Sequence, residues 1–124
     1  MSDYSFDYHF IKAGAPIVTL NSTGIAFNPV VRSMLGHPEY IAIGFDAGRK
    51  AIGARPAQER EDADVYPFEG REKNGWVRIG CREFIKHLSE ITEMDFSNKA
   101  IQFSAHRTGN DLEVVIEINE DNMR

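Results

Sequence analysis

Four basic side chains in the first half of the chain have chemistry that is easy to name: Arg32, Arg49, Lys50 and Arg55. A guanidinium group forks onto a phosphate or onto the edge of a guanine, and an ammonium group contacts phosphate as a point charge. Clustered on one face, the four would form a nucleic-acid-binding surface. The competing interpretation is a solvated hairpin edge, where Lys and Arg prevent pairing with a neighbouring sheet.

A second mixture of cations and aromatic rings lies between residues 66 and 78. Its members are the aromatic residues Tyr66, Phe68 and Trp76 and the cations Arg71, Lys73 and Arg78. Exposed rings flanked by cations are what a stacking surface for single-stranded nucleic acid requires. The competing interpretation is burial, because aromatic side chains at inward strand positions usually fill a core.

No grouping of residues predicts catalysis or a metal site. His9, His37, His87 and His106 lie on four different predicted elements, without the close spacing of zinc ligands. Cys81 stands at a predicted helix start, where a thiol pKa can fall, but a small buried side chain is the competing interpretation. Phosphate-binding glycine loops and nucleophile elbows are absent from the sequence. We therefore expect a protein that is not an enzyme and has no cofactor.

The stretch from Ile17 to Pro56 must position the first group of cations. Short β-branched runs predict strands over 17–20 and 25–27. Asn28 as a cap and Pro29 in the first turn predict a helix that ends at Gly36. A hairpin is predicted with strands over 40–45 and 50–55 around the turn at 46–49. Alternating aromatic and polar residues over 4–11 predict one further strand.

The second half has a similar pattern of predicted elements. After a charged connector over 57–64, we expect an edge strand at 65–68, a turn at 69–75, a strand at 76–79 and an amphipathic helix over 81–91. A second hairpin is predicted from the strands 99–105 and 112–118. The two halves therefore resemble an internal pseudo-repeat, although strand, helix and hairpin also follow one another in unrelated α+β domains.

These elements predict an α+β fold in which two strand–short helix–β-hairpin units form one small barrel-like or two-sheet domain. We expect a single domain over residues 1–124, with β-rich units at 1–56 and 65–124 joined by the connector at 57–64. A chain of 124 residues is long enough to bury a core without disulfides or metals.

The composition is that of a globular protein, with 42% hydrophobic and 27% charged residues. One cysteine, no long apolar run and no leader pattern at the start predict a cytoplasmic location without membrane attachment. The net charge of −5 is uneven: residues 1–56 hold five Lys and Arg against four acids, whereas residues 57–124 hold nine against fifteen. Such an acidic chain disfavours unspecific phosphate binding but permits a local basic face.

The stretch Gly24–Gly36 (GIAFNPVVRSMLG), followed by a hairpin that ends in IGARP, resembles the AbrB/MazE-type swapped-hairpin domain over about residues 17–56. Arg32, Leu35 and Gly36 match the family spacing, and Pro29 lies one place later than the family's proline. The resemblance implies a small dimeric DNA-binding module used in transcription regulation or as an antitoxin. Of the family's DNA-contacting basic residues, Arg32 alone corresponds by position.

Two hypotheses of function follow. The first is a DNA-binding regulator or antitoxin-like module that uses Arg32, Arg49, Lys50 and Arg55 and that forms homo-oligomers. The second is a protein–protein interaction or assembly module without nucleic-acid binding, suggested by the acidic second half and the hairpin edges.

Overall fold

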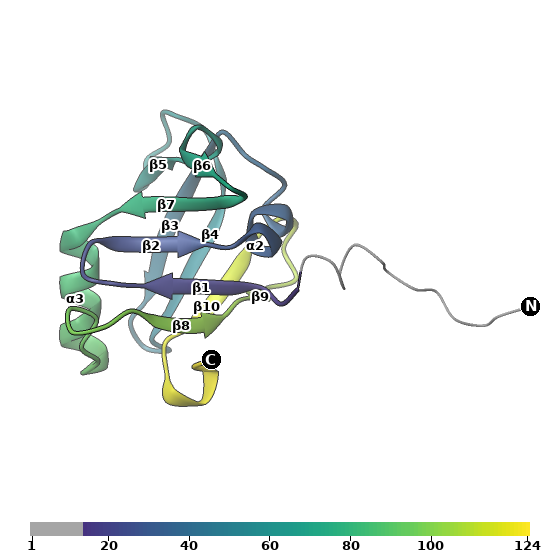
Figure 1. The fold of residues 1–124 in the computed structure, drawn as a ribbon. Coiled ribbons are helices and arrows are strands. Elements are labelled where there is room, and N and C mark those ends of the chain that lie inside the picture. The colour runs from purple at the N-terminus through teal and green to yellow at the C-terminus, as the bar shows by residue number, and fades with distance from the viewer. Residues whose placement is uncertain (1–13) are drawn as a thin grey trace, which may run out of the picture.

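The computed structural model describes residues 14–124, which form two antiparallel five-stranded sheets and two α-helices (Figure 1). The first sheet has the strand order β6 (Glu72–Lys73), β7 (Trp76–Gly80), β2 (Gly24–Phe27), β1 (Ile17–Leu20) and β8 (Ile101–Ser104). The second has the order β5 (Val65–Pro67), β3 (Tyr40–Asp46), β4 (Ala51–Ala57), β10 (Val114–Glu117) and β9 (His106–Arg107). The predicted α+β class is confirmed in its two-sheet form, and the sheets do not close into a barrel.

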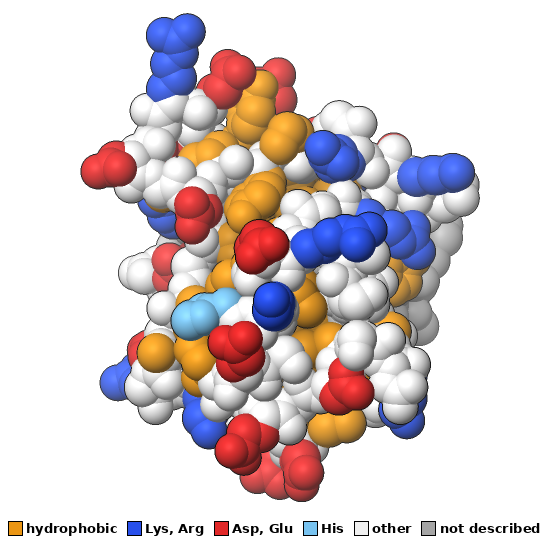
Figure 2. Space-filling view, turned by 90° about the vertical axis from the view of Figure 1, so that its left-hand side faces the viewer, with side chains coloured by type: hydrophobic (Ala, Val, Ile, Leu, Met, Phe, Trp, Pro, Cys, Tyr) orange, Lys and Arg blue, Asp and Glu red, His pale blue; other side chains and the backbone are white. Residues whose placement is uncertain are grey.

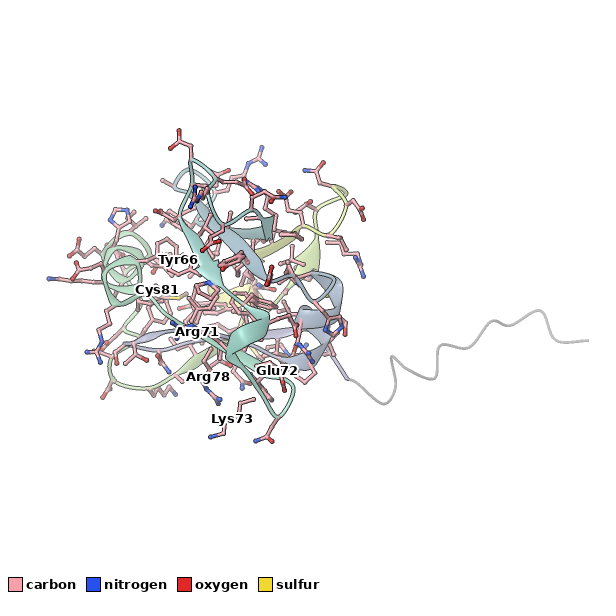
Figure 3. The ribbon with its side chains drawn as sticks, turned by 90° about the horizontal axis from the view of Figure 1, so that it is seen from above. Tyr66, Arg71, Glu72, Lys73, Arg78 and Cys81 are labelled. Carbon is pink, nitrogen blue, oxygen red and sulfur yellow. The ribbon has the colours of Figure 1, made fainter. Side chains whose placement is uncertain are left out.

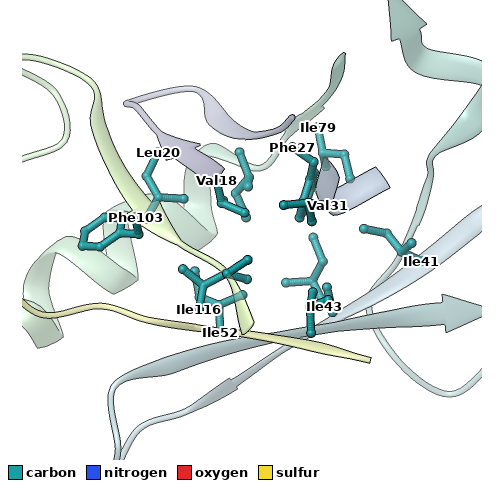
Figure 4. Packing of buried hydrophobic residues seen from close by; sticks show 14 of the residues in the cluster. Val18, Leu20, Phe27, Val31, Ile41, Ile43, Ile52, Ile79, Phe103 and Ile116 are labelled. Atoms are coloured by element: carbon teal, nitrogen blue, oxygen red, sulfur yellow. The ribbon is translucent and has the colours of Figure 1, made fainter. Parts of the chain in front are cut away.

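A single hydrophobic cluster lies between the two sheets (Figure 4). Because side chains alternate along a strand, each sheet contributes every second residue to this cluster. Val18 and Phe27 of the first sheet and Ile52 and Ile116 of the second are all fully buried. Burial of this apolar surface is the main force that holds the sheets together.

The first helix, α2 (Pro29–Met34), begins where the sequence predicts. The Asn28 side chain accepts a hydrogen bond from the backbone N–H of Val31 at 3.1 Å and donates one to the carbonyl of Ala15 at 2.7 Å. Gly36 has a φ of 79° beyond the end of the helix, a conformation that glycine adopts without strain. The cap therefore fixes both the start of α2 and the preceding chain.

The second helix, α3 (Arg82–Thr92), covers one end of the sheets (Figure 1). Its buried side chains are Ile85 and Leu88, so its other face is exposed. Short 3-10 helices, η1 (Glu69–Arg71) and η2 (Glu120–Asn122), complete the fold. Within residues 14–124, no helix is long and apolar enough to cross a membrane.

The predicted second hairpin does not pair residues 99–105 with 112–118; β10 instead forms a short hairpin with β9, with Val114 opposite Arg107. β8 pairs with β1 in the first sheet, whereas β10 pairs with β4 in the second. The chain crosses from one sheet to the other at Ala105, which is buried. In both β8 and β10, every second side chain is directed toward the core, as predicted. The two strands belong to different sheets, however, and therefore contribute to the core from opposite sides. The structure therefore does not confirm the second predicted unit or the pseudo-repeat.

Two further expectations concern the ends of the predicted units. The predicted strand over 4–11 lies outside the described residues. The connector at 57–64 separates β4 from β5, yet β2 of the first half pairs with β7 of the second, and β4 pairs with β10. Each sheet therefore combines strands from both halves of the chain.

Candidate nucleic-acid interface

Arg32 lies on α2 and is held by a carboxylate. Its Nε and one terminal nitrogen donate to the two carboxylate oxygens of Glu69 at 2.7 and 2.8 Å. These hydrogen bonds lower the pKa of the Glu69 carboxyl and raise that of the Arg32 guanidinium, each by favouring the charged form. The His37 ring lies 3.3 Å from the same carboxylate. Arg32 therefore joins α2 to η1 and does not stand free for a ligand.

The other three predicted binding residues lie along β4 and its preceding turn. Arg55 forms an ion pair with Glu61 at 2.9 Å, and Arg49 lies 4.0 Å from Asp46 with 87% of its side chain exposed. Lys50 is exposed beside Arg49. Arg55 lies five positions after Lys50 along extended chain, which is a distance of about 16 Å. The structure therefore does not gather the four predicted cations into one surface, and nucleic-acid binding by them stays a prediction.

A different set of cations is free, and we call it the basic track. Its five members are Arg71, Lys73, Arg78, Arg82 and Lys86. All five are exposed, and none forms an ion pair or donates a side-chain hydrogen bond within residues 14–124. Figure 2 shows several basic side chains standing close together on the right of the face that carries α3.

The β6–β7 hairpin positions the first part of the basic track. Trp76 and Arg78 alternate on β7 with Val77 and Ile79, which are buried, so the former pair lies on the outer face of the sheet. Lys73 is the cross-strand partner of Trp76 and shares that face. Figure 3 shows Lys73 and Arg78 projecting from the same side of the molecule.

The connection between β6 and β7 is a two-residue turn that the sequence analysis missed. Asn74 and Gly75 have φ values of 56° and 87°, the conformation that a tight hairpin turn of this type requires. Asn-Gly is the strongest short sequence signal for such a hairpin, and it stands within the segment predicted only as a turn over 69–75. A two-residue hairpin turn at Asn74 and Gly75 predicts that Lys73 lies opposite Trp76, as the structure shows.

The aromatic residues of the predicted stacking surface have different positions. Phe68 is fully buried and packs edge-on against Phe27, with the ring centroids 5.5 Å apart. Tyr66 is half-buried on β5. Trp76 is half-buried on the outer face, and the guanidinium carbon of Arg78 lies 5.9 Å from the centroid of its indole. Trp76 is therefore the ring that stands among free cations.

Three hollows follow the basic track. The first, of about 180 Å³, lies between Arg71 and Arg78 over the glycines of β2 and β7. The second, of about 620 Å³, shares Thr23 and Gly80 with the first and extends to Arg82. The third, of about 380 Å³, shares Arg82 with the second and continues along α3. The three hollows are therefore neighbours along the surface from β7 to α3, and each shares at least one lining residue with the next.

Gly24 allows the floor of the first hollow to form. A Cβ atom at this position would lie 1.9 Å from the carbonyl oxygen of Ile79 on β7. Only glycine permits so close an approach of the two strands. The cross-strand partner of Gly24 is Gly80, so no side chain rises between Arg78 and Arg82 on this row.

Known proteins give no guide to this surface. Comparison of the chain with protein-family models, with curated proteins and with solved structures finds no match. The resemblance of residues 17–56 to the AbrB/MazE-type domain therefore stays a prediction.

Cys81 lines the second hollow and is partly buried. Burial raises the pKa of the Cys81 thiol to about 11, so the group remains protonated near neutral pH. Its sulfur lies 3.9 Å from the carbonyl oxygen of Ile79. The side chain also packs against the hydrophobic core. These observations favour the buried interpretation of Cys81 over nucleophilic chemistry.

The histidines of the described chain remain apart from one another. His37 approaches Glu69, the His87 ring lies edge-on to Phe45 with centroids 6.4 Å apart, and His106 lies 3.3 Å from the side-chain oxygen of Asn122. Over residues 14–124, no three His, Cys, Asp or Glu side chains group in a way that would hold a metal ion.

Proposed function

We propose that the protein binds single-stranded nucleic acid along the outer face of β6 and β7. The observation that carries the proposal is the position of Trp76 among Arg71, Lys73 and Arg78, cations without an ion-pair partner in the described chain. One base would stack on the indole, and the three cations would contact the neighbouring phosphates.

The typical energies of base stacking and of phosphate contacts support a single strand as the ligand. Stacking of a base on an aromatic ring contributes about 1–3 kcal/mol and needs a base free of its partner strand. Three phosphate contacts predict a slope of about −2 for log affinity against log salt, at about −0.7 per contact. Trp76 is half-buried, so its indole loses less side-chain freedom on binding than a fully exposed ring would.

The four cations predicted from the sequence support a duplex-binding regulator less well. Arg32 and Arg55 already neutralise Glu69 and Glu61, so a phosphate contact would require these ion pairs to break. The acidic character of the chain opposes unspecific duplex binding as well. A local surface with free cations and an aromatic ring does not depend on the net charge of the chain.

A protein partner is the second candidate. Phe45, Tyr66 and Phe84 are partly buried aromatic residues packed on the core, and the rings of Phe45 and Phe84 lie edge-on with centroids 6.1 Å apart. Figure 2 shows hydrophobic side chains between charged ones on the face that carries α3. Aromatic residues are enriched at the centres of protein interfaces. The hairpin edges support this candidate less, because the β5 edge ends in Pro67.

The test is a fluorescence-anisotropy titration of a labelled single-stranded oligonucleotide and its duplex, at about 50 mM and about 200 mM salt. We expect the single strand to bind more tightly, with affinity falling as salt rises. Trp76→Ala should weaken binding about 5- to 150-fold, which corresponds to the energy of one stacked base. Arg78→Ala should also make the salt slope shallower by about 0.7.

Arg49→Ala is the matched control, because Arg49 is an exposed arginine on the turn between β3 and β4, in the sheet that does not contain β6 and β7. Unchanged affinity in this variant is expected. The proposal is overturned if the single strand does not bind at low salt. It is equally overturned if the duplex is preferred and Arg49→Ala, but not Trp76→Ala, abolishes binding, since that result would restore the surface predicted from the sequence. Absence of all binding would direct attention to a protein partner.

A further inference from the structure

The third hollow lies at the end of the basic track, between α3, the turn after β1 and the turn before β8. It is lined by the polar residues Ser22, Arg82 and Lys86 and by the apolar residues Ile85 and Phe96. Arg82 and Lys86 are separated by one helical turn and therefore lie on the same side of α3. A volume of about 380 Å³ is within the usual range for small-ligand sites.

Three side chains of this hollow have hydrogen-bonding groups to offer. Arg82, Lys86 and Ser22 have no side-chain partner within residues 14–124. The Ser89 hydroxyl donates to the carbonyl of Met94 and is already engaged. The available groups are thus two cations and one hydroxyl.

The two turns that border the hollow are stabilised by hydrogen bonds of their own, which do not involve the side chains of Ser22, Arg82 and Lys86. The Asn21 side-chain oxygen accepts hydrogen bonds from the backbone of Thr23 at 2.9 Å and of Gly24 at 3.0 Å, which fixes the turn that carries Ser22. The Ser97 hydroxyl, on the other wall, donates to Asp95. The hollow is therefore built from a helix and two hydrogen-bonded turns.

We infer that this hollow binds a phosphate monoester. A monoester carries a charge of about −1.5 to −2 near neutral pH and matches the two cations, whereas an internal phosphodiester carries one charge. Glu90 also lines the hollow beyond Lys86, and its carboxylate would repel the next phosphate of a continuing strand. The site therefore fits the end of a strand better than its interior.

This inference rests on the proposed function for its ligand, because Arg82 lines both this hollow and the second one. A strand whose base stacks on Trp76 would pass over Gly80 and place its terminal phosphate between Arg82 and Lys86. A free mononucleotide offers the same monoester chemistry, so the experiment includes both ligands.

The experiment compares three oligonucleotides of one sequence: with a 5′-phosphate, with a 3′-phosphate and with neither, each labelled at an internal position. We expect one of the two phosphates to tighten binding about tenfold, as charge-assisted hydrogen bonds of ordinary strength predict. Lys86→Gln should abolish that difference, so that the three oligonucleotides bind with equal affinity. Arg71→Gln should weaken all three by the same factor, since Arg71 lies at the other end of the track.

Glu90→Gln is the matched control on α3, because it alters one charge in the same hollow with the opposite sign. It should tighten binding of the phosphorylated strand. Adenosine monophosphate, titrated as a competitor, distinguishes the two sources of the monoester. We expect adenosine monophosphate to displace the phosphorylated strand, and we expect this displacement to depend on Lys86.

Each outcome separates the two proposals. Equal affinity for all three oligonucleotides would overturn the monoester site and leave the strand-binding face intact. If no oligonucleotide binds but the mononucleotide does, and Lys86→Gln removes that binding, the monoester site stands and the proposed function falls. Binding of none of these ligands would overturn both. Circular dichroism of the variants excludes loss of folding as the cause.

Discussion

Replacing Arg32 by alanine separates two roles for this residue: a phosphate contact, as predicted from the sequence, and a support for η1, as its geometry indicates. Two hydrogen bonds of 2.7 and 2.8 Å join it to Glu69, and the two side chains are 22% and 26% exposed. Hydrogen bonds to charged groups contribute about 1.5–3 kcal/mol, and solvent screening reduces this for partly exposed pairs. We expect a coupling free energy of about 1–2 kcal/mol.

The assay is a double-mutant cycle of Arg32→Ala and Glu69→Ala, followed by urea unfolding at pH 7 and at about pH 3. The folded-state pKa of Glu69 lies below its ordinary value, so the stabilisation is complete above that ordinary value. It is lost as the pH falls through the lowered pKa. The coupling should therefore be smaller at the acidic pH than at pH 7. Arg49→Ala, which removes an exposed arginine, should change stability by less than about 0.5 kcal/mol.

Ligand binding by the Arg32→Ala variant completes the test. Loss of a support should weaken binding through displacement of η1 and its Arg71, and Glu69→Ala should weaken it by the same factor, because it breaks the same contact. If Arg32 were instead a phosphate contact, Glu69→Ala would leave its guanidinium free and would not weaken binding. A coupling free energy below about 0.3 kcal/mol at pH 7, together with weakened binding in Arg32→Ala but not in Glu69→Ala, would refute the supporting role and restore the contact.

Two further predictions concern the strands beneath the basic track. Gly24→Ala should destabilise the protein by more than about 3 kcal/mol in urea unfolding, because the added Cβ would overlap the Ile79 carbonyl. Gly53→Ala, with open space around the added Cβ, should change the stability little. Equal effects of the two substitutions would contradict the close approach of β2 and β7. Alkylation of Cys81 at pH 7 should be about 100-fold slower than that of a thiol of ordinary pKa. The alkylation rate should keep rising toward pH 11. A rate that reaches its plateau by pH 9 would contradict the burial of the thiol.

Local signals in the sequence were sufficient to predict the start of α2 but insufficient to predict which strands pair in the two sheets. Asn28 and Pro29 act within one helical turn, so the start of the helix follows from neighbouring residues alone. The partner of a strand depends on distant residues. Alternation in β8 and β10 shows which side chains are buried, but Phe103 and Ile116 enter the core from opposite sheets. Periodicity does not distinguish that arrangement from a hairpin.

The candidate site was only partly visible in the sequence for an electrostatic reason. Arg32 and Arg55 of the more basic half pair with Glu69 and Glu61, which belong to the acidic half. Counting charges by half therefore did not reveal that Arg32 and Arg55 are paired with carboxylates. Arg82 and Lys86 were missed, although their spacing of four residues on an amphipathic helix was a signal for a shared exposed face.

The stretch around α2 contributes to the candidate surface by supporting it. Arg32 holds η1 through Glu69, and Pro29 packs beneath the β6–β7 turn, where a Cβ added at Gly75 would lie 2.9 Å from the Pro29 ring. Both contacts fix the hairpin that carries Trp76. The helix that resembles a DNA-contacting element would thus act on a ligand through the position of that hairpin. Arg32→Ala in α2 should then lower the stability of the protein and its affinity for the ligand together, whereas Arg78→Ala on β7 should lower the affinity alone.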